Sequence, residues 1–140
     1  MCGNTPDHFV AFTDSVVAPS AARAYVRQHS CPDHGTIAVD ALLLITSELV
    51  TNAVLYGSPP ITVGLSCLTS EVRLSVSDTG PTLPDEQGMR GGLGLVIVAR
   101  IAREWGTMPL VVGKEVWCRV PTGMLPVRTG PRGRAILHLT

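Results

Sequence analysis

The sequence predicts an α+β fold, a two-layer sandwich in which helices cover one face of a mostly antiparallel, mixed sheet. Segments of alternating apolar and polar residues, typical of strands, occur in pairs beside longer segments with helical spacing. The expected order is strand, helix, helix, strand, strand, loop, helix, strand, strand. With 140 residues, of which 45% are hydrophobic and 16% charged, the chain is expected to bury one core.

The first half of the chain is expected to hold one short strand and two helices. Residues 9–12 predict an edge strand, and residues 21–29 predict a helix with Ser20 as its N-cap. A longer helix is predicted over residues 36–56, with Thr36 as its cap. Apolar residues recur along this helix at spacings of three and four, and they are expected on its buried face: Leu42, Ile45, Leu49 and Ala53.

Two strands are predicted next, at residues 61–67 and 72–78, because apolar and polar side chains alternate in both. Asp78 continues the apolar row of the second strand, which is expected to face the core. A carboxylate in that position is costly unless it has a partner. Asp78 is therefore the first residue that points to a functional site.

The last part of the chain predicts a loop, a helix and a hairpin. The loop spans residues 79–92, and connections of this length are usually functional or mobile. An apolar helix is predicted over residues 94–105. A final hairpin is predicted from strands at residues 110–112 and 116–120.

The composition argues against several classes of protein. Eleven basic and eleven acidic side chains cancel to zero net charge, which argues against direct nucleic-acid binding through a broad basic face. Uninterrupted apolar runs are far shorter than the roughly 20 residues that span a bilayer, and the first residues do not resemble a signal peptide. We therefore expect a cytoplasmic protein without a membrane segment, with one domain at residues 1–125 and a loose tail at residues 126–140.

Glu48 and Asn52 are four residues apart and so project from the same face of the long helix. An amide oxygen such as that of Asn52 suits Mg²⁺, which binds a few protein oxygens together with phosphates. A carboxylate one turn away, Glu48, can accept a proton from an attacking hydroxyl. For the pair alone, the plainer alternative is a solvated helix face.

Asp78 and a nearby glycine suggest the binding of a flat ring that carries an amine. The carboxylate can accept a hydrogen bond from an exocyclic amine such as that of adenine. Gly80 lets the backbone approach the ring closely. The alternative is an Asx turn that ends the strand.

A glycine-rich segment, Gly91-Gly92-Leu93-Gly94, leads into the third predicted helix. Backbone N–H groups at the start of a helix favour anions, and Arg90 can add charge-assisted contacts to a phosphate. The alternative is a flexible hinge. The segment fits neither the P-loop nor the dinucleotide-binding pattern.

Together, three segments resemble the nucleotide-binding boxes of the GHKL superfamily, the gyrase, chaperone, histidine kinase and mismatch-repair ATPases that share the Bergerat fold. Residues 48–57 are similar to the N box, residues 76–81 to the G1 box and residues 92–95 to the G2 box. The resemblance covers roughly residues 9–121 and is strongest to short bacterial anti-sigma-factor serine/threonine kinases.

The resemblance implies ATP and Mg²⁺ as cofactors, with Asn52 as the metal ligand and Glu48 as the general base that activates a hydroxyl on a partner protein. It implies these nucleotide-binding residues: Asn52, Asp78, Gly80, Arg90, Gly91, Gly92, Leu93, Gly94 and Leu95. It further implies a kinase that phosphorylates an antagonist of the anti-anti-sigma type and binds a sigma factor. Family members often form homodimers.

Four departures from the family pattern keep other hypotheses open. Tyr56 stands where a His is common, Thr82 stands where a second Gly is common, and Arg90 is the only cation in a short lid. Glu115 replaces a Thr that usually supports adenine through a water, so its carboxylate either weakens nucleotide binding or turns outward. The second hypothesis is a catalytically silent regulator that binds a partner through a degenerate nucleotide site. The third is a detached ATPase domain that serves a sensor protein.

Overall fold

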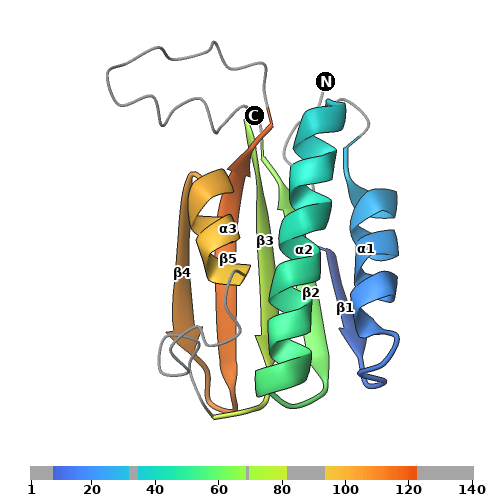
Figure 1. The fold of residues 1–140 in the computed structure, drawn as a ribbon, viewed down its shortest axis with the longest axis vertical. Coiled ribbons are helices and arrows are strands. Elements are labelled where there is room, and N and C mark those ends of the chain that lie inside the picture. Colours follow the sequence, from blue (N-terminus) through green and yellow to red (C-terminus); the bar gives the residue numbers. More distant parts are fainter. Residues whose placement is uncertain (1–7, 32–34, 69, 82–93, 123–140) are drawn as a thin grey trace.

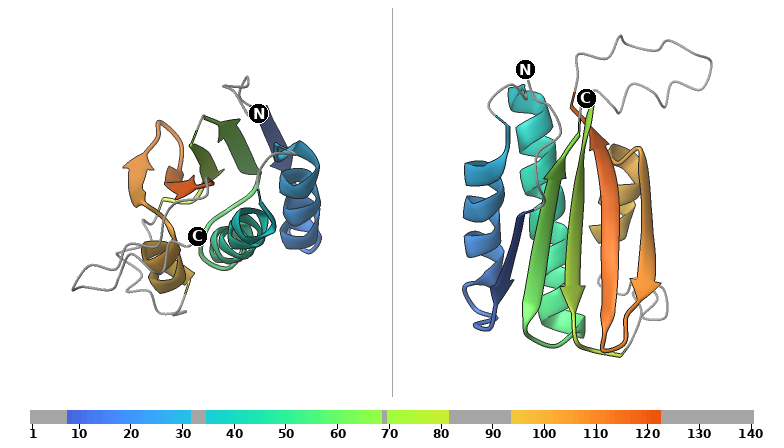
Figure 2. Two further views of the ribbon diagram at one scale, coloured as in Figure 1. Left: turned by 90° about the horizontal axis from the view of Figure 1, so that it is seen from above. Right: turned by 180° about the vertical axis from the view of Figure 1, so that it is seen from behind.

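The computed structural model describes residues 8–31, 35–68, 70–81 and 94–122, and it confirms the α+β fold. Its elements, in chain order, are β1 (His8–Phe12), α1 (Ala18–His29), α2 (Thr36–Tyr56), β2 (Ile61–Cys67), β3 (Glu71–Asp78), α3 (Gly94–Ile101), β4 (Glu104–Pro109) and β5 (Lys114–Pro121). The strands form one sheet, and the three helices of the described ranges lie on the same face of it (Figures 1 and 2). The molecule therefore has two layers, as the sequence predicts.

The strands of the described residues are arranged in the order β1-β2-β3-β5-β4, and each neighbouring pair is antiparallel. β3 and β5 lie side by side, although α3 and β4 stand between them in the sequence. Their register places Asp78 opposite Lys114 at one end of both strands. The sheet thus brings together two charged residues that are far apart in the chain.

α2 is the core helix of the domain and packs against the sheet and α1. The four apolar residues predicted on its buried face are each at most 6% exposed, which confirms that prediction. By length and composition alone, α2 is also the one helix of the described residues that could cross a membrane, over Ile37–Tyr56. α2 packs its apolar face against the sheet, as the core helix of a globular domain does (Figure 2).

Both predicted N-caps were wrong, the first by three residues and the second by one. α1 begins at Ala18, and its N-cap is Val17. The Ser20 hydroxyl lies inside the first turn and donates a hydrogen bond to the Val17 carbonyl. Likewise, Thr36 is the first residue of α2 and Gly35 is the N-cap, with no side-chain cap hydrogen bond at either helix.

The C-terminal hairpin lies earlier in the chain than predicted. α3 starts at Gly94 as expected but ends at Ile101, so the predicted helix over residues 94–105 was too long. The predicted strand at residues 110–112 is instead the turn between β4 and β5. Trp105 explains the difference, because it belongs to β4 and packs on the core from there. This tertiary contact outweighs the local spacing that favours a longer helix.

Candidate functional site

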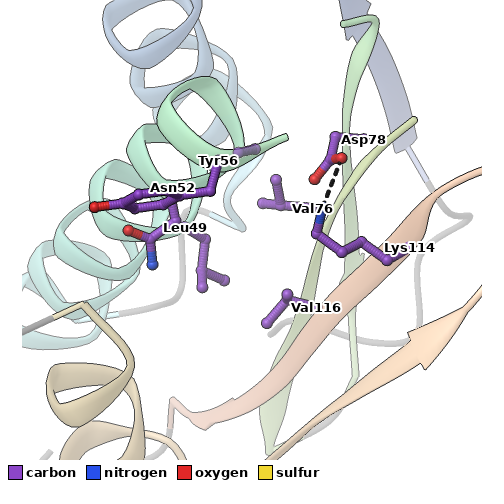
Figure 3. A pocket seen from close by; sticks show the side chains of 8 residues that line it. Leu49, Asn52, Tyr56, Val76, Asp78, Lys114 and Val116 are labelled. Carbon is purple, nitrogen blue, oxygen red and sulfur yellow. Dashed lines mark hydrogen bonds and ion pairs between the residues drawn. The ribbon is translucent and has the colours of Figure 1, made fainter. Parts of the chain in front are cut away.

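A small pocket lies between the C-terminal half of α2 and the paired ends of β3 and β5 (Figure 3). Its walls combine apolar side chains with an amide, a phenol, a carboxylate and an ammonium group: Leu49, Asn52, Ala53, Tyr56, Val76, Asp78, Lys114 and Val116. The cavity measures about 20 Å³, which is room for about one water molecule. Polar groups from three segments of the chain therefore converge on a nearly filled space.

Asp78 faces this pocket from the end of β3, as the strand alternation predicted, and is 5% exposed. Three donors converge on its Oδ1 atom: the backbone N–H of Gly80 at 2.7 Å, the backbone N–H of Ser58 at 3.3 Å and the Lys114 ammonium at 2.9 Å. The buried carboxylate thus has the partner that its position demands. Lys114 was not among the predicted site residues, because it lies 36 residues further along the chain.

Glycines let two loops close around the Asp78 carboxylate. A Cβ atom on Gly57 would collide with that carboxylate, and one on Gly80 would lie 3.0 Å from the Gly57 Cα atom. A Cβ on Gly113, which has a φ of 90°, would collide with the Asp78 carbonyl oxygen. Gly80 therefore permits the close approach of the Gly57 backbone, while its predicted contact with a flat ring stays a prediction. The contributions of Gly57 and Gly113 emerge only from the fold.

The two predicted polar residues of α2 have different surroundings. Asn52 is partly buried and lines the pocket, one helical turn before Tyr56. Glu48 lies one turn before Asn52 and is also partly buried, but it is not among the residues that line the pocket. The fold therefore brings Asn52 and Asp78 together, while Glu48 lies further along the same helix.

β5 presents neighbouring side chains to opposite faces of the sheet, and this decides where Glu115 points. Lys114 is buried on the helix side, in phase with Val116 and Cys118. Glu115 points to the helix-free face and forms an ion pair with Arg73, with an Oε2–Nη2 distance of 3.0 Å. Of the two outcomes expected for Glu115, the structure shows the outward side chain. Extending the strand alternation back from Val116 is the signal that would have found Lys114.

The Asp78–Lys114 ion pair is almost fully buried, with side chains that are 4% and 5% exposed. Transferring charges out of water costs several kcal/mol per ion, and a close partner of opposite charge offsets that cost. Removing one partner leaves an uncompensated charge and typically costs about 3–5 kcal/mol of stability. Asp78 and Lys114 therefore each need the other to offset the free-energy cost of burying a charge.

Part of the predicted site lies outside the described residues. The residues concerned are Thr82, Arg90, Gly91, Gly92 and Leu93, together with the domain boundary at residue 125 and the tail at residues 126–140. The last two predicted nucleotide-binding residues, Gly94 and Leu95, are the first residues of α3. The expected helix start directly after the glycine-rich segment is therefore confirmed.

Comparison with protein families shows which family the chain belongs to. Residues 37–124 match the family described as histidine kinase-, DNA gyrase B-, and HSP90-like ATPase. The chain belongs to this family. The match runs from α2 through β5, so it includes Asn52, Asp78 and Lys114. The resemblance to the GHKL superfamily noted in the sequence is thereby confirmed.

Solved structures share the fold. The crystal structure of the RsbU and RsbW domains of Rv1364c from Mycobacterium tuberculosis matches with a TM-score of 0.59 and 22% sequence identity. The match covers 82% of this chain and 31% of that chain, so the present chain spans less than a third of that protein's length. No curated protein matches the chain. At this level of identity the structural likeness establishes a common fold.

The pocket suits an adenine nucleotide in its chemistry but not in its present volume. Asp78 offers an acceptor for the adenine amine, and Asn52 offers an amide oxygen for Mg²⁺. Within the described ranges, no group of three or more His, Cys, Asp or Glu side chains could hold a metal. A cavity of about 20 Å³ does not admit a purine ring while the Lys114 side chain lies across it.

Proposed function

We propose that this chain is an ATP-binding regulatory protein of the anti-sigma-factor type, a cytoplasmic serine/threonine protein kinase that acts on an antagonist protein and binds a sigma factor. The convergence of Asn52 from α2 and Asp78 from β3 on one pocket carries the proposal, within a chain of the ATPase family. The fold shared with a structure that contains an RsbW domain supports the regulatory part.

The residues around the pocket have complementary roles in nucleotide binding. The Asp78 carboxylate accepts a hydrogen bond from the adenine amine, and Gly80 lets the ring approach the backbone. Asn52 would supply an oxygen ligand to Mg²⁺, which would neutralise charge on the phosphates when bound. Residues 90–95 contact the phosphates through a cationic side chain and backbone N–H groups at the start of α3.

Glu48 is the general base in this proposal. It lies one turn before Asn52 and remains partly exposed, so a hydroxyl-bearing side chain of a partner protein can reach it. The Glu48 carboxylate takes the hydroxyl proton while the hydroxyl oxygen bonds to the γ-phosphorus of ATP. The bond from that phosphorus to the β–γ bridging oxygen breaks, so the products are ADP and a phosphorylated partner.

Calorimetry with ATP, in the presence and absence of Mg²⁺, tests the binding part of the proposal. The wild-type protein is expected to bind, and Asn52→Ala is expected to lose the Mg²⁺-dependent part of the affinity. Arg73→Ala, on the helix-free face, is the matched control and should bind as the wild type does. Equal binding by Asn52→Ala and the wild type would contradict the assigned role of Asn52.

Incubation with labelled ATP, Mg²⁺ and partners captured by pull-down tests the kinase part. We expect phosphoserine or phosphothreonine on an antagonist with the wild type but not with Glu48→Gln, which keeps the shape of the side chain without the base. Glu48→Gln should still bind ATP. If the folded, ATP-binding wild type transfers no phosphate to any captured antagonist, the chain is not its kinase.

A catalytically silent, partner-binding regulator is the second candidate. It is favoured by the small volume of the pocket and by the Lys114 ammonium that lies against Asp78. Such a protein would bind its partner equally with and without ATP. Asn52→Ala would then leave partner binding unchanged, whereas an ATP-dependent regulator would lose the effect of ATP.

A further inference from the structure

The group that occupies the space beside Asp78 is the ammonium of Lys114. We propose that Lys114 competes with the adenine amine for Asp78 and thereby sets the affinity of the pocket for nucleotide. The inference rests on the proposed function, because it takes adenine as the ligand of Asp78. It makes Lys114 an affinity-determining residue that a nucleotide must displace.

Occupancy of the pocket is the first argument. Nζ of Lys114 lies 2.9 Å from Oδ1 of Asp78, and its side chain extends from β5 toward that carboxylate (Figure 3). Both side chains are at most 5% exposed, and both line the remaining cavity of about 20 Å³. With the Lys114 side chain in this position, the space beside Asp78 is too small for a purine ring.

The backbone around Lys114 is the second argument. The β3–β5 register sets Lys114 directly opposite Asp78, and the alternation along β5 turns its side chain to the helix side. Gly113 precedes it with a φ of 90° and packs so closely on the Asp78 carbonyl that no Cβ atom would fit. The strand pairing and the turn together hold Lys114 against Asp78.

The strength of the ion pair is the third argument. A hydrogen bond to an ionised partner is roughly twice as strong as one between neutral groups, and in the Asp78–Lys114 pair both groups are charged. The adenine amine is neutral, so its hydrogen bond to Asp78 alone does not offset the loss of the ammonium. The lysine stem is long and flexible, so the ammonium can withdraw while the backbone stays in β5. Nucleotide affinity is therefore lower with Lys114 than without it.

Calorimetry with adenosine and with ADP tests the inference on Lys114→Ala and Lys114→Met. Both variants should bind either ligand about tenfold more tightly than the wild type, the effect of one charge-assisted hydrogen bond. Adenosine carries no phosphate, so a gain with adenosine cannot come from the changed charge near phosphates. Arg73→Met is the matched control: it removes one positive charge from the opposite face of the sheet and should leave the affinity unchanged.

A second measurement uses the wild-type protein and so does not depend on the folding of a variant. Lys114 is the single lysine of the chain, so protein labelled with ¹⁵N-lysine carries one labelled side-chain ammonium group. Its NMR signal should shift, or be lost to exchange with water, when ADP saturates the protein. An unchanged signal in the ADP-bound protein would show that the ion pair stays intact.

The outcomes separate this inference from the proposed function. If the wild type binds ADP and the Lys114 variants bind it equally or more weakly, the inference is wrong and nucleotide binding stands. If neither the wild type nor the variants bind adenosine or ADP, both fail. Tight binding by the variants alone would support the inference and show that Lys114 closes the pocket of the wild type.

Discussion

Two of the ion pairs that join β3 to β5 lie on opposite faces of the sheet, and they differ in burial. Asp78–Lys114 lies on the helix side with a distance of 2.9 Å and side chains that are 4% and 5% exposed. Arg73–Glu115 lies on the helix-free face with a distance of 3.0 Å and side chains that are 38% and 18% exposed. Because the two N–O distances are nearly equal, the difference in burial decides how much each ion pair contributes to the free energy of unfolding.

The comparison shows how one strand can serve two purposes. Adjacent residues of β5 point to opposite faces, so Lys114 enters the pocket and Glu115 reaches the partly solvated face. A buried pair is expensive to break, whereas an exposed pair typically contributes about 0–1 kcal/mol. On the buried face, a ligand that replaces one partner of the ion pair changes the free energy of the folded protein strongly. The same replacement on the helix-free face would change that free energy little.

The largest predicted effect is the loss of Lys114. Lys114→Met should lower the free energy of unfolding by about 3–5 kcal/mol, because Asp78 is left buried with an uncompensated charge. Urea denaturation measures the loss. The double variant Asp78→Asn, Lys114→Met should recover part of the stability, since no unpaired charge remains. A loss below about 1 kcal/mol for the single variant would contradict this expectation, because the buried ion pair would then contribute no more to stability than an exposed one.

A methyl group at Gly57 should have the next largest effect. Gly57→Ala places its Cβ against the Asp78 carboxylate, so we expect a loss of about 1–3 kcal/mol from overpacking, together with weaker ADP binding. Gly64→Ala is the control on the helix-free face, where the new Cβ would meet the Ser75 hydroxyl, whose side chain is short, and the Phe9 ring, which is 64% exposed and can move. Denaturation curves in which Gly64→Ala costs more than Gly57→Ala would contradict this expectation.

Cys118, on the buried face of β5, should make the protein sensitive to alkali. Burial raises the pKa of this thiol to about 12 from an ordinary value of 9.0, although the positive charge of Arg73 and a backbone hydrogen bond with Leu74 lower it in part. Above pH 9 the unfolded thiol ionises while the folded one does not. Stability should therefore fall between pH 9 and 12, by up to about 1.4 kcal/mol per pH unit.

Denaturation measured across this pH range, with Cys118→Ala as the control, tests the alkaline effect. The variant should lack the part of the slope that arises from Cys118. The same slope in both proteins would assign the alkaline loss to other groups.

The smallest effect is expected on the helix-free face. Arg73→Ala should lower the free energy of unfolding by less than about 1 kcal/mol, because solvent screens its pair with Glu115. The measured loss should shrink further in high salt. A part that persists in salt would come from the contact of the guanidinium with the Trp117 ring, 5.4 Å from its centroid.

Some site residues could be found from the sequence, and others could not. Asn52 and Asp78 were predictable because each lies on a local pattern, helical spacing or strand alternation, that fixes the face on which it lies. Glu48 obeys the same helical pattern, yet only the packing of α2 against the sheet shows that it lies beyond the pocket. Local periodicity reports which side of an element is buried, but not how far along that side a pocket extends.

The sequence by itself determined the types of the elements, the buried face of α2 and the faces on which Asn52 and Asp78 lie, because these follow from short-range periodicity and residue chemistry. Only the tertiary structure decided the length of α3, the place of β4 and the pairing of Asp78 with Lys114. A shift of the alternation by one residue would exchange Lys114 and Glu115 between the faces of the sheet. The charge inside the pocket is therefore a property of the strand register, which forms only when β3 and β5 pair.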